Sequence, residues 1–298
     1  NDLTSFYSFT GGLVAPDSDN NPWNYKFTWN PRNVVMAGNG VSQFIKNGRY
    51  KYIPYHRLFD RAFNRKILGY GDFEVYANRD SLKYRSIYDL KDIPSMFRGT
   101  IRRPGFSKAW NVFVRLGMTE DNYTLESSEN MTYRQFLNSF LRYEPNVPAE
   151  IKLQEYCSNA ADPVVMEKLK WLGIFDERKI GLKNATPAQI LQQLLEERWS
   201  MDPQDKDMIV MQHEFKYLTD GVEKMIVSAM AVIGKNQTET AMAITVGLPL
   251  AIATKLLMLG KFNHTGVILP TEKQMYEPIL DELSTFGITF EENEYLIG

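Results

Sequence analysis

The N-terminal part of the chain shows short runs of apolar and aromatic residues separated by polar loops. Leu3–Thr10 is rich in aromatic and hydroxyl side chains, which favours a strand, and Gly11-Gly12 predicts a turn at its end. Three later runs, "RYKYIPY", "FEVYAN" and "FRGTIRR", predict further strands. Pro104 predicts the start of a helix that ends at Gly117. This region therefore predicts a unit dominated by strands.

Apolar positions recur at helical spacing between Asn30 and Gly48. Asn30 is a typical N-cap before Pro31, and the apolar set is Val34, Ala37, Val41, Phe44 and Ile45. Within this segment, Gly38-Asn39-Gly40 resembles the turn that binds a dinucleotide pyrophosphate. That fingerprint requires a strand before it, a helix after it and a third glycine or alanine, where this chain has Gln43. We therefore predict one helix that runs through both glycines, and no nucleotide-binding turn in these residues.

Consecutive helical patterns joined by short polar links occupy residues 132–199. Thr132 and Thr186 are predicted N-caps. Two strand-like runs, "DMIVMQHEFKYL" and "VEKMIVSAMAV", then flank Asp220-Gly221, which predicts a type I′ hairpin turn. The remaining residues predict a helix, the strand "TGVIL", a helix from Thr271 and the strand "ITFEENEY".

This distribution predicts an α/β (α+β) fold: a mixed β-sheet with helices on one face, plus an all-helical insertion. We assign residues 1–120 and 206–240 to the mixed-sheet domain, 121–205 to the insertion and 241–298 to a C-terminal segment. The most apolar run, "AMAITVGLPLAIATKLLMLG", is interrupted by polar residues and Pro249. We therefore interpret it as a buried or domain-bridging pair of helices and not as a membrane span.

Composition narrows the functional classes. The net charge is -2 over 298 residues, so no basic footprint for nucleic acid is present, and we expect neither a nucleic-acid nor a membrane partner. Cys157 is the only cysteine, which excludes an intrachain disulfide and favours a cytoplasmic location. His56, His213 and His264 are scattered, so no metal site is predicted. No hydrolase elbow or phosphate-binding loop occurs. The start at Asn1, within a strand-like run, suggests a piece of a longer protein.

Two arginine-bearing stretches are the candidates for chemistry. In "YANRDS", Asn78, Arg79 and Ser81 follow the end of a predicted strand. In "RGTIRR", Arg98, Thr100 and Arg102 alternate and share one face of a regular strand. Paired guanidinium groups with amide and hydroxyl donors suit a small molecule with several carboxylates. The alternative is a solvated strand with ordinary ion pairs.

At these residues the sequence resembles the saccharopine reductase family, the glutamate-forming saccharopine dehydrogenases. The motifs "SFTGGLVAP", "NPWNYKFTWNPR", "YANRDS", "FRGTIRRPGF", "LKWLGIF", "MIVMQHEF" and "TAMAITVGLPLAIATKLL" occur in the family's order. The resemblance implies a substrate domain of the dehydrogenase C-terminal type that also forms a homodimer. It further implies a preceding Rossmann domain, which would bind most of the NADP and against which residues 241–298 would pack.

The resemblance also implies roles for individual residues. Arg79, Thr100, Ile101 and Arg102 would hold a tricarboxylate substrate, with the two arginines on carboxylates. Trp29 would border the cofactor. Thr10, Gly11, Gly12 and Leu13 would line the substrate cleft. No residue is marked as a general acid or base.

Some positions depart from the family pattern and leave the substrate open. Thr10 stands where a cysteine is common, Arg103 stands where an aromatic residue is expected, and "GKNQTETAMA" lacks the usual glycine-rich approach. We therefore retain three alternatives for the longer protein: a saccharopine dehydrogenase, an enzyme resembling carboxynorspermidine reductase, or a non-catalytic dimerisation module. This piece alone is expected to be inactive.

Overall fold

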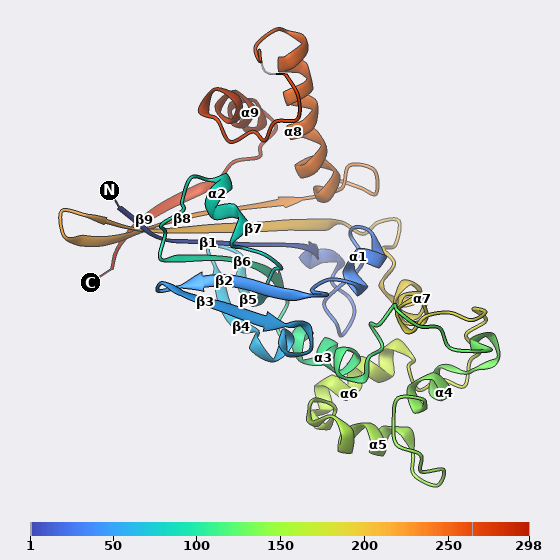
Figure 1. Cartoon of the computed structure of the whole chain (residues 1–298). Helices are drawn as coiled ribbons and strands as arrows, with labels where there is room; N and C mark the ends of the chain where they lie inside the picture. Colours follow the sequence, from blue (N-terminus) through green and yellow to red (C-terminus); the bar gives the residue numbers. More distant parts are fainter. Residues whose placement is uncertain (1, 264, 298) are drawn as a thin grey trace.

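The central strand of the sheet, β1 (Asp2–Val14), pairs with two strands from distant parts of the chain (Figure 1). In the computed structural model, which describes residues 2–263 and 265–297, β1 lies parallel to β6 (Ser95–Arg102) and antiparallel to β7 (Asp207–Thr219). The turn predicted at Gly11-Gly12 is wrong, because β1 continues to Val14. Gly11 instead permits close packing: a Cβ there would lie 2.6 Å from the carbonyl oxygen of Ile101.

The described residues form one nine-stranded mixed sheet. Its main order is β3-β2-β6-β1-β7-β8-β9, and β5 pairs with both β6 and β4. The other strands are β2 (Val41–Lys46), β3 (Arg49–Pro54), β4 (Phe63–Ile67), β5 (Gly71–Ala77), β8 (Val222–Ile233) and β9 (Glu291–Ile297). β7 and β8 form the predicted hairpin, with Asp220 and Gly221 at positive φ angles of 51° and 79° as a type I′ turn requires. β4 lies between the runs "RYKYIPY" and "FEVYAN", in residues for which the sequence predicts no strand.

The segment between Asn30 and Gly48 differs from the predicted single helix. Asn30 caps α1 (Pro31–Val35) as predicted, since its side chain accepts a hydrogen bond from the backbone N–H of Asn33. The helix then stops, and β2 begins at Val41. Gly38 and Gly40 have φ angles of +89° and +97°, which a right-handed helix does not contain. The order is helix, turn, strand, the reverse of a dinucleotide-binding turn.

The insertion packs on one face of the sheet through a cluster of aromatic residues. Trp199 contacts Trp23 and Trp110, with ring centroids 5.1 Å and 6.0 Å apart, and all three side chains are buried. Thr132 and Thr186 form capping boxes with Gln135 and Gln189, which confirms both predicted caps. The helices on this side are α3 (Phe106–Leu116), α4 (Tyr133–Asn138), α5 (Ala149–Tyr156), α6 (Pro163–Leu172) and α7 (Pro187–Trp199).

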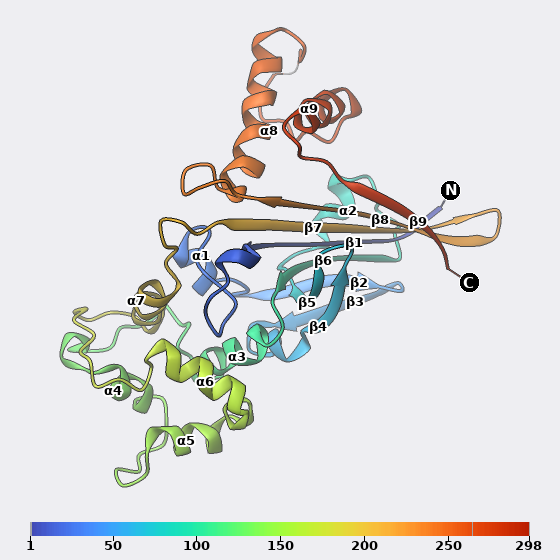
Figure 2. The same cartoon turned by 180° about the vertical axis from the view of Figure 1, so that it is seen from behind.

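The C-terminal residues lie on the other side of the sheet, as both views show (Figures 1 and 2). α8 (Ala241–Met258) contacts β7 and β8, and α9 (Lys273–Thr285) packs against α8. Helices therefore cover both faces, whereas the sequence predicts one. β9 pairs with β8 along Glu291–Ile297, so the end of the segment 241–298 belongs to the sheet. "TGVIL" forms no strand, and His264 lies outside the described residues.

The apolar run from Ala241 forms one continuous helix that contains Pro249, and not the predicted pair of helices. Nor is it buried: Ala241 and Ile252 are its only buried residues, and Val246, Leu250, Leu257 and Met258 are exposed. Among the described residues, α8 is the one helix that by length and composition is able to cross a membrane. The bridging role of α8 and the division of the chain into domains stay predictions. The mixed α/β fold with its all-helical insertion is confirmed.

Candidate functional site

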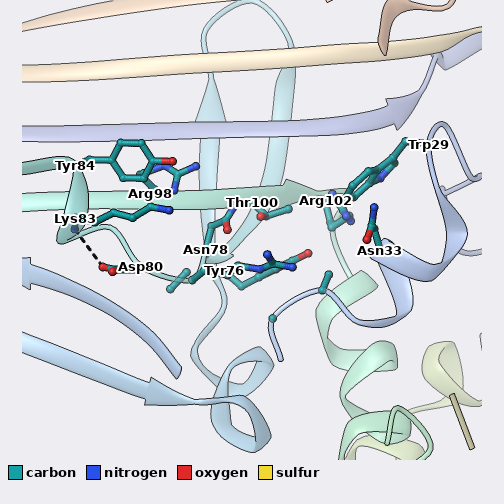
Figure 3. A pocket seen from close by; sticks show the side chains of 14 residues that line it. Trp29, Asn33, Tyr76, Asn78, Asp80, Lys83, Tyr84, Arg98, Thr100 and Arg102 are labelled. Carbon is teal, nitrogen blue, oxygen red and sulfur yellow. Dashed lines mark hydrogen bonds between the residues drawn. The ribbon is translucent and has the colours of Figure 1, made fainter. Parts of the chain in front are cut away.

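A cavity of about 520 Å³ opens where β5 and β6 meet the segment before and after α1. Figure 3 shows its labelled side chains. Arg98, Thr100 and Arg102 of β6 all line it, which confirms that their alternation places them on one face. Tyr76 and Asn78 contribute from the end of β5, and Trp29 and Asn33 from the α1 side. The cavity is therefore built from three segments that are distant in sequence.

The cavity is strongly cationic. Arg79, Lys83, Arg98 and Arg102 line it, against a single carboxylate, Asp80. Asp80 Oδ1 accepts hydrogen bonds from the backbone N–H groups of Leu82 and Lys83, at 2.8 Å and 3.3 Å. Within the described part of the chain, none of the four cations forms an ion pair with a carboxylate. The ordinary ion pairs that the sequence left as an alternative are thus not seen at Arg98 and Arg102, and the cavity is suited to anions.

Arg102 is held by aromatic rings. Its Cζ lies 5.0 Å from the ring centroid of Tyr25, 5.5 Å from Phe106 and 5.9 Å from Tyr76. The residue is only 3% exposed. Nη1 donates to the carbonyl oxygen of Ile101 at 2.9 Å, and Nε has no partner among the described residues. Aromatic faces attract a cation without neutralising it, so the charge of Arg102 stays available to a ligand.

Burial affects the tyrosine beneath this guanidinium. The Tyr25 side chain is fully buried, and its hydroxyl has no hydrogen-bond partner in residues 2–263 and 265–297. Burial raises the pKa of Tyr25, and the nearby charge of Arg102 opposes that shift only in part. Tyr25 therefore stays neutral at physiological pH. It supplies a ring for the cation and no compensating negative charge.

The "NRDS" segment, residues 78–81, fills a break in the pairing along β6, between the part paired with β2 and the part paired with β5. β2 pairs with β6 at Ile45–Met96, and β5 pairs with β6 from Gly99 onward, which leaves a gap at Arg98. Residues 78–81 fill this gap. The backbone N–H of Asn78 donates to the carbonyl oxygen of Arg98, and the N–H of Arg98 donates to Ser81 Oγ. Gln43 of β2 exchanges backbone hydrogen bonds with this segment.

Arg79 sits at the apex of this connection. Its φ angle is 42°, in the left-handed region. Its carbonyl oxygen accepts a hydrogen bond from Gln43 at 2.8 Å, while its exposed side chain lines the cavity. A non-glycine residue adopts this conformation only when its surroundings hold it there. The hydrogen bonds to β2 and β6 do so here.

The structure brings together five of the eleven residues predicted for the site. Asn78, Arg79, Thr100, Arg102 and Trp29 line the cavity. Ser81 lies beside it but is 1% exposed, with its hydroxyl bound to the backbone of Arg98. Its hydroxyl supports the backbone that carries Arg98, and its substrate-binding role stays a prediction.

The residues predicted on β1 lie outside the cavity lining. Thr10 pairs with Thr100, and Gly12 lies two residues further along the same face. Gly11 faces Ile101, and the Leu13 and Ile101 side chains are wholly buried in the main core. Only backbone atoms of these last residues remain to face a ligand. Their binding roles stay predictions.

Sequence reasoning missed several residues of the lining, among them Asn33, Tyr76, Lys83 and Tyr84. Strand alternation could have identified Tyr76, because it lies two residues before Asn78 at the end of β5. Lys83 and Tyr84 lie in or next to α2 (Lys83–Ile87), whose short helix carried no clear apolar period. Arg103, in turn, points away: its Cζ lies 4.9 Å from the Phe73 ring, outside the cavity lining. This departure from the family pattern therefore does not alter the cavity.

The fold and the cavity together define a mixed α/β domain with a cationic cavity at the edge between β5 and β6. The chain belongs to the saccharopine dehydrogenase C-terminal domain family, which matches residues 1–288. This confirms the resemblance noted in the sequence.

Two relatives illustrate the match. The mitochondrial alpha-aminoadipic semialdehyde synthase of Mus musculus is 32% identical over 296 residues, which cover 97% of this chain and 32% of that protein. The saccharopine dehydrogenase (NADP(+), L-glutamate-forming) of Saccharomyces cerevisiae is 30% identical over 297 residues, covering 97% of this chain and 66% of that protein. The chain thus spans a third to two thirds of the length of these relatives.

A solved structure shares the fold. The apo histidine-tagged saccharopine dehydrogenase (L-Glu forming) from Saccharomyces cerevisiae superposes with a TM-score of 0.87 at 29% identity. The match covers 99% of this chain and 67% of that structure.

Proposed function

We propose that this chain is the substrate-binding part of an NADP(H)-dependent oxidoreductase that acts on the CH–NH bond of saccharopine. The cationic cavity is the observation that carries the proposal, because its arginine charges lack carboxylate partners among the described residues. Saccharopine brings three carboxylates, which would supply those partners. Saccharopine is formed from glutamate and aminoadipate semialdehyde, so the proposed reaction belongs to lysine metabolism.

The role of these residues is to position the substrate. Arg79 and Arg102 would each bind a carboxylate, and Thr100 and Asn78 would donate or accept hydrogen bonds between them. Holding two carboxylates of the ligand keeps the carbon of the reacting bond in one place, which is how binding energy lowers the barrier. The ligand also supplies the negative charge that this buried guanidinium lacks.

The cofactor, when bound, supplies or accepts the hydride. Trp29 is the residue here that would border it: it is 39% exposed at one end of the cavity, where its ring would meet the nicotinamide. We propose that a preceding Rossmann domain binds the rest of the cofactor and that α8 and α9 pack against that domain. The proposal includes a cytoplasmic homodimer, with the location supported by the single, buried Cys157.

Two other functions fit the same fold. A carboxylated polyamine, the substrate of carboxynorspermidine reductases, carries a similar carbon-nitrogen bond. A non-catalytic dimerisation module would keep the cavity and bind a tricarboxylate without turning it over.

The test is NADP(H)-linked turnover by the full-length protein, with saccharopine and carboxynorspermidine as substrates, beside an Arg79→Ala variant. We expect saccharopine turnover and a loss of kcat/KM of about a hundredfold in the variant, equivalent to about 2.7 kcal/mol. Arg49→Ala is the matched control, because this exposed arginine of β3 lies outside the cavity lining. Turnover of carboxynorspermidine alone would select the polyamine function. Binding of saccharopine without turnover of either substrate would select the non-catalytic module.

A further inference from the structure

We propose that Arg98 and Lys83, together with the ring of Tyr84, form a second anion subsite at the end of the cavity opposite Arg102. The inference rests on the proposed function and deepens it. It requires a ligand that carries anionic groups at both ends, and so selects an extended tricarboxylate over a carboxylated polyamine.

The two ends of the cavity are well separated. Arg98 and Arg102 lie four residues apart on β6, so their Cα atoms are about 13 Å apart at the usual strand rise. Figure 3 shows Lys83, Tyr84 and Arg98 gathered at one end and Trp29, Asn33 and Arg102 at the other, with Asn78 and Thr100 between them. The cavity is thus elongated along the strand. A short anion would reach one end only.

Two cations share one aromatic ring at this end. The Arg98 Cζ lies 4.1 Å from the Tyr84 ring centroid, and the Lys83 Nζ lies 5.2 Å from it. The ring attracts both charges, but the two charges repel each other. An anion placed near both would remove that repulsion. The nearest acidic side chain of the lining, Asp80, is already engaged with backbone N–H groups.

Two arginines elsewhere in the domain show what a compensated guanidinium looks like, one in the sheet and one in the insertion. Arg65 makes a two-point contact with Glu214, and Arg134 makes one with Glu150. Arg98 is half-buried and forms no such pair within the described residues. Its backbone is fixed by hydrogen bonds to Asn78 and Ser81. The side chain is therefore held at the cavity with its charge uncompensated.

This arrangement discriminates between the two substrate classes. Two amino acids joined through a shared nitrogen place carboxylates at both ends of an extended molecule. A carboxylated polyamine would place an ammonium group at one end, where Lys83 and Arg98 would repel it. The second subsite thus supplies both attraction for the tricarboxylate and rejection of the polyamine.

The test uses the full-length protein with Arg98→Gln and Lys83→Gln. Equilibrium binding of saccharopine is measured by calorimetry, and turnover by NADP(H)-linked assay. We also use two saccharopine analogues, each lacking one terminal carboxylate. Each variant is expected to weaken saccharopine binding and to raise KM about tenfold or more, with a smaller change in kcat. For one of the two analogues, the same variants are expected to change KM little, because the group that they would bind is absent. Lys51→Gln is the matched control, an exposed lysine of β3 outside the cavity lining.

The outcomes separate this inference from the proposed function. Saccharopine turnover with an unchanged KM and unchanged binding in both variants would overturn the second subsite and leave the function standing. Weaker binding in the variants without turnover by the wild type would support the subsite and overturn the catalytic function. A wild type that does not bind saccharopine would overturn both. If Arg98→Lys binds saccharopine more tightly than Arg98→Gln does, the loss in Arg98→Gln comes from the missing charge and not from misfolding.

Discussion

The guanidinium carbon of Arg102 lies 5.0 Å from the ring centroid of Tyr25, deep in the domain and without a carboxylate partner in the part of the chain that the structure describes. Burying a cation in this way costs free energy, since the ring only partly replaces water. The folded protein keeps the charge nonetheless. Such an arrangement is typical of a site whose counter-charge arrives with the ligand.

Arg102→Met is therefore expected to separate function from stability. If the proposed function holds, removal of the cation should lower kcat/KM of the full-length protein for saccharopine by about a hundredfold or more, or about 2.7 kcal/mol. Stability should stay the same or rise, because an uncompensated buried charge is replaced by an apolar chain of similar length. Thermal unfolding and steady-state kinetics measure the two effects.

Arg103→Met is the matched control, since the neighbouring arginine lies over Phe73 outside the cavity lining. It should leave kcat/KM within about twofold. A large loss of stability in Arg102→Met would show instead that the guanidinium holds the core together.

Gly11→Ala is expected to destabilise the sheet. A Cβ at this position would lie 2.6 Å from the carbonyl oxygen of Ile101 and 2.7 Å from its Cγ1, so β1 and β6 would have to move apart. Overpacking of this kind costs about 1–3 kcal/mol. Urea unfolding would measure it. Gly247→Ala provides the comparison, because no atom lies within 4 Å of the Cβ that the substitution adds. Alanine in the middle of α8 should raise the free energy of unfolding by up to about 1 kcal/mol. Equal stability of the two variants would contradict the close packing at Gly11.

His213 is expected to make stability fall in mild acid. Its ring lies between Phe6 and Phe290, with centroids 6.0 Å and 5.5 Å away, and burial lowers its pKa from 6.5. Below about pH 6.5 the unfolded chain binds a proton that the folded chain does not, so stability decreases as the pH falls through the folded pKa. The slope for one such group is at most about 1.4 kcal/mol per pH unit.

His213→Phe should flatten this part of the profile, as measured by urea unfolding between pH 7 and pH 5. His56→Phe, at an exposed position, should retain the slope. An unchanged slope in the His213 variant would assign the acid sensitivity to other groups.

Lys26→Met is expected to destabilise the protein by about 3–5 kcal/mol. Lys26 Nζ lies 2.5 Å from Asp205 Oδ2, and the two side chains are only 4% and 3% exposed. Without the lysine, a buried carboxylate would lack its counter-charge. The double variant Lys26→Met with Asp205→Leu should recover much of the loss, as measured by chemical unfolding. Lys235→Met, which removes an exposed pair with Glu239, should cost less than about 1 kcal/mol.

Local signals in the sequence predicted local structure well. Asn30, Thr132 and Thr186 cap helices as predicted, because a cap depends on three or four neighbouring residues. The prediction failed after α1, where Val41, Phe44 and Ile45 fit a helical period over a short run. Positive φ angles at Gly38 and Gly40 end the helix, and Phe44 and Ile45 take opposite faces of β2.

The site was predictable only in part. Alternation along β6 placed Arg98, Thr100 and Arg102 together, and this was correct. Two of the aromatic rings around Arg102 come from Tyr25 and Tyr76, which reach it only through tertiary packing. The role of Tyr84 likewise depends on how α2 folds over β6. No local pattern contains such long-range contacts.

The hydrogen bonds that hold residues 78–81 between β2 and β6 affect the thermodynamics of ligand binding. Fixing the backbone of a free residue costs about 1–2 kcal/mol in conformational entropy. Asn78, Arg79 and Ser81 are already tied to Gln43 and Arg98 by hydrogen bonds like those of a strand. That entropy is lost when the domain folds, so it does not weaken the affinity for the ligand. This side of the cavity is therefore preorganised before the ligand binds. The cavity would select its ligand by shape and charge and not by ordering of the segment on binding.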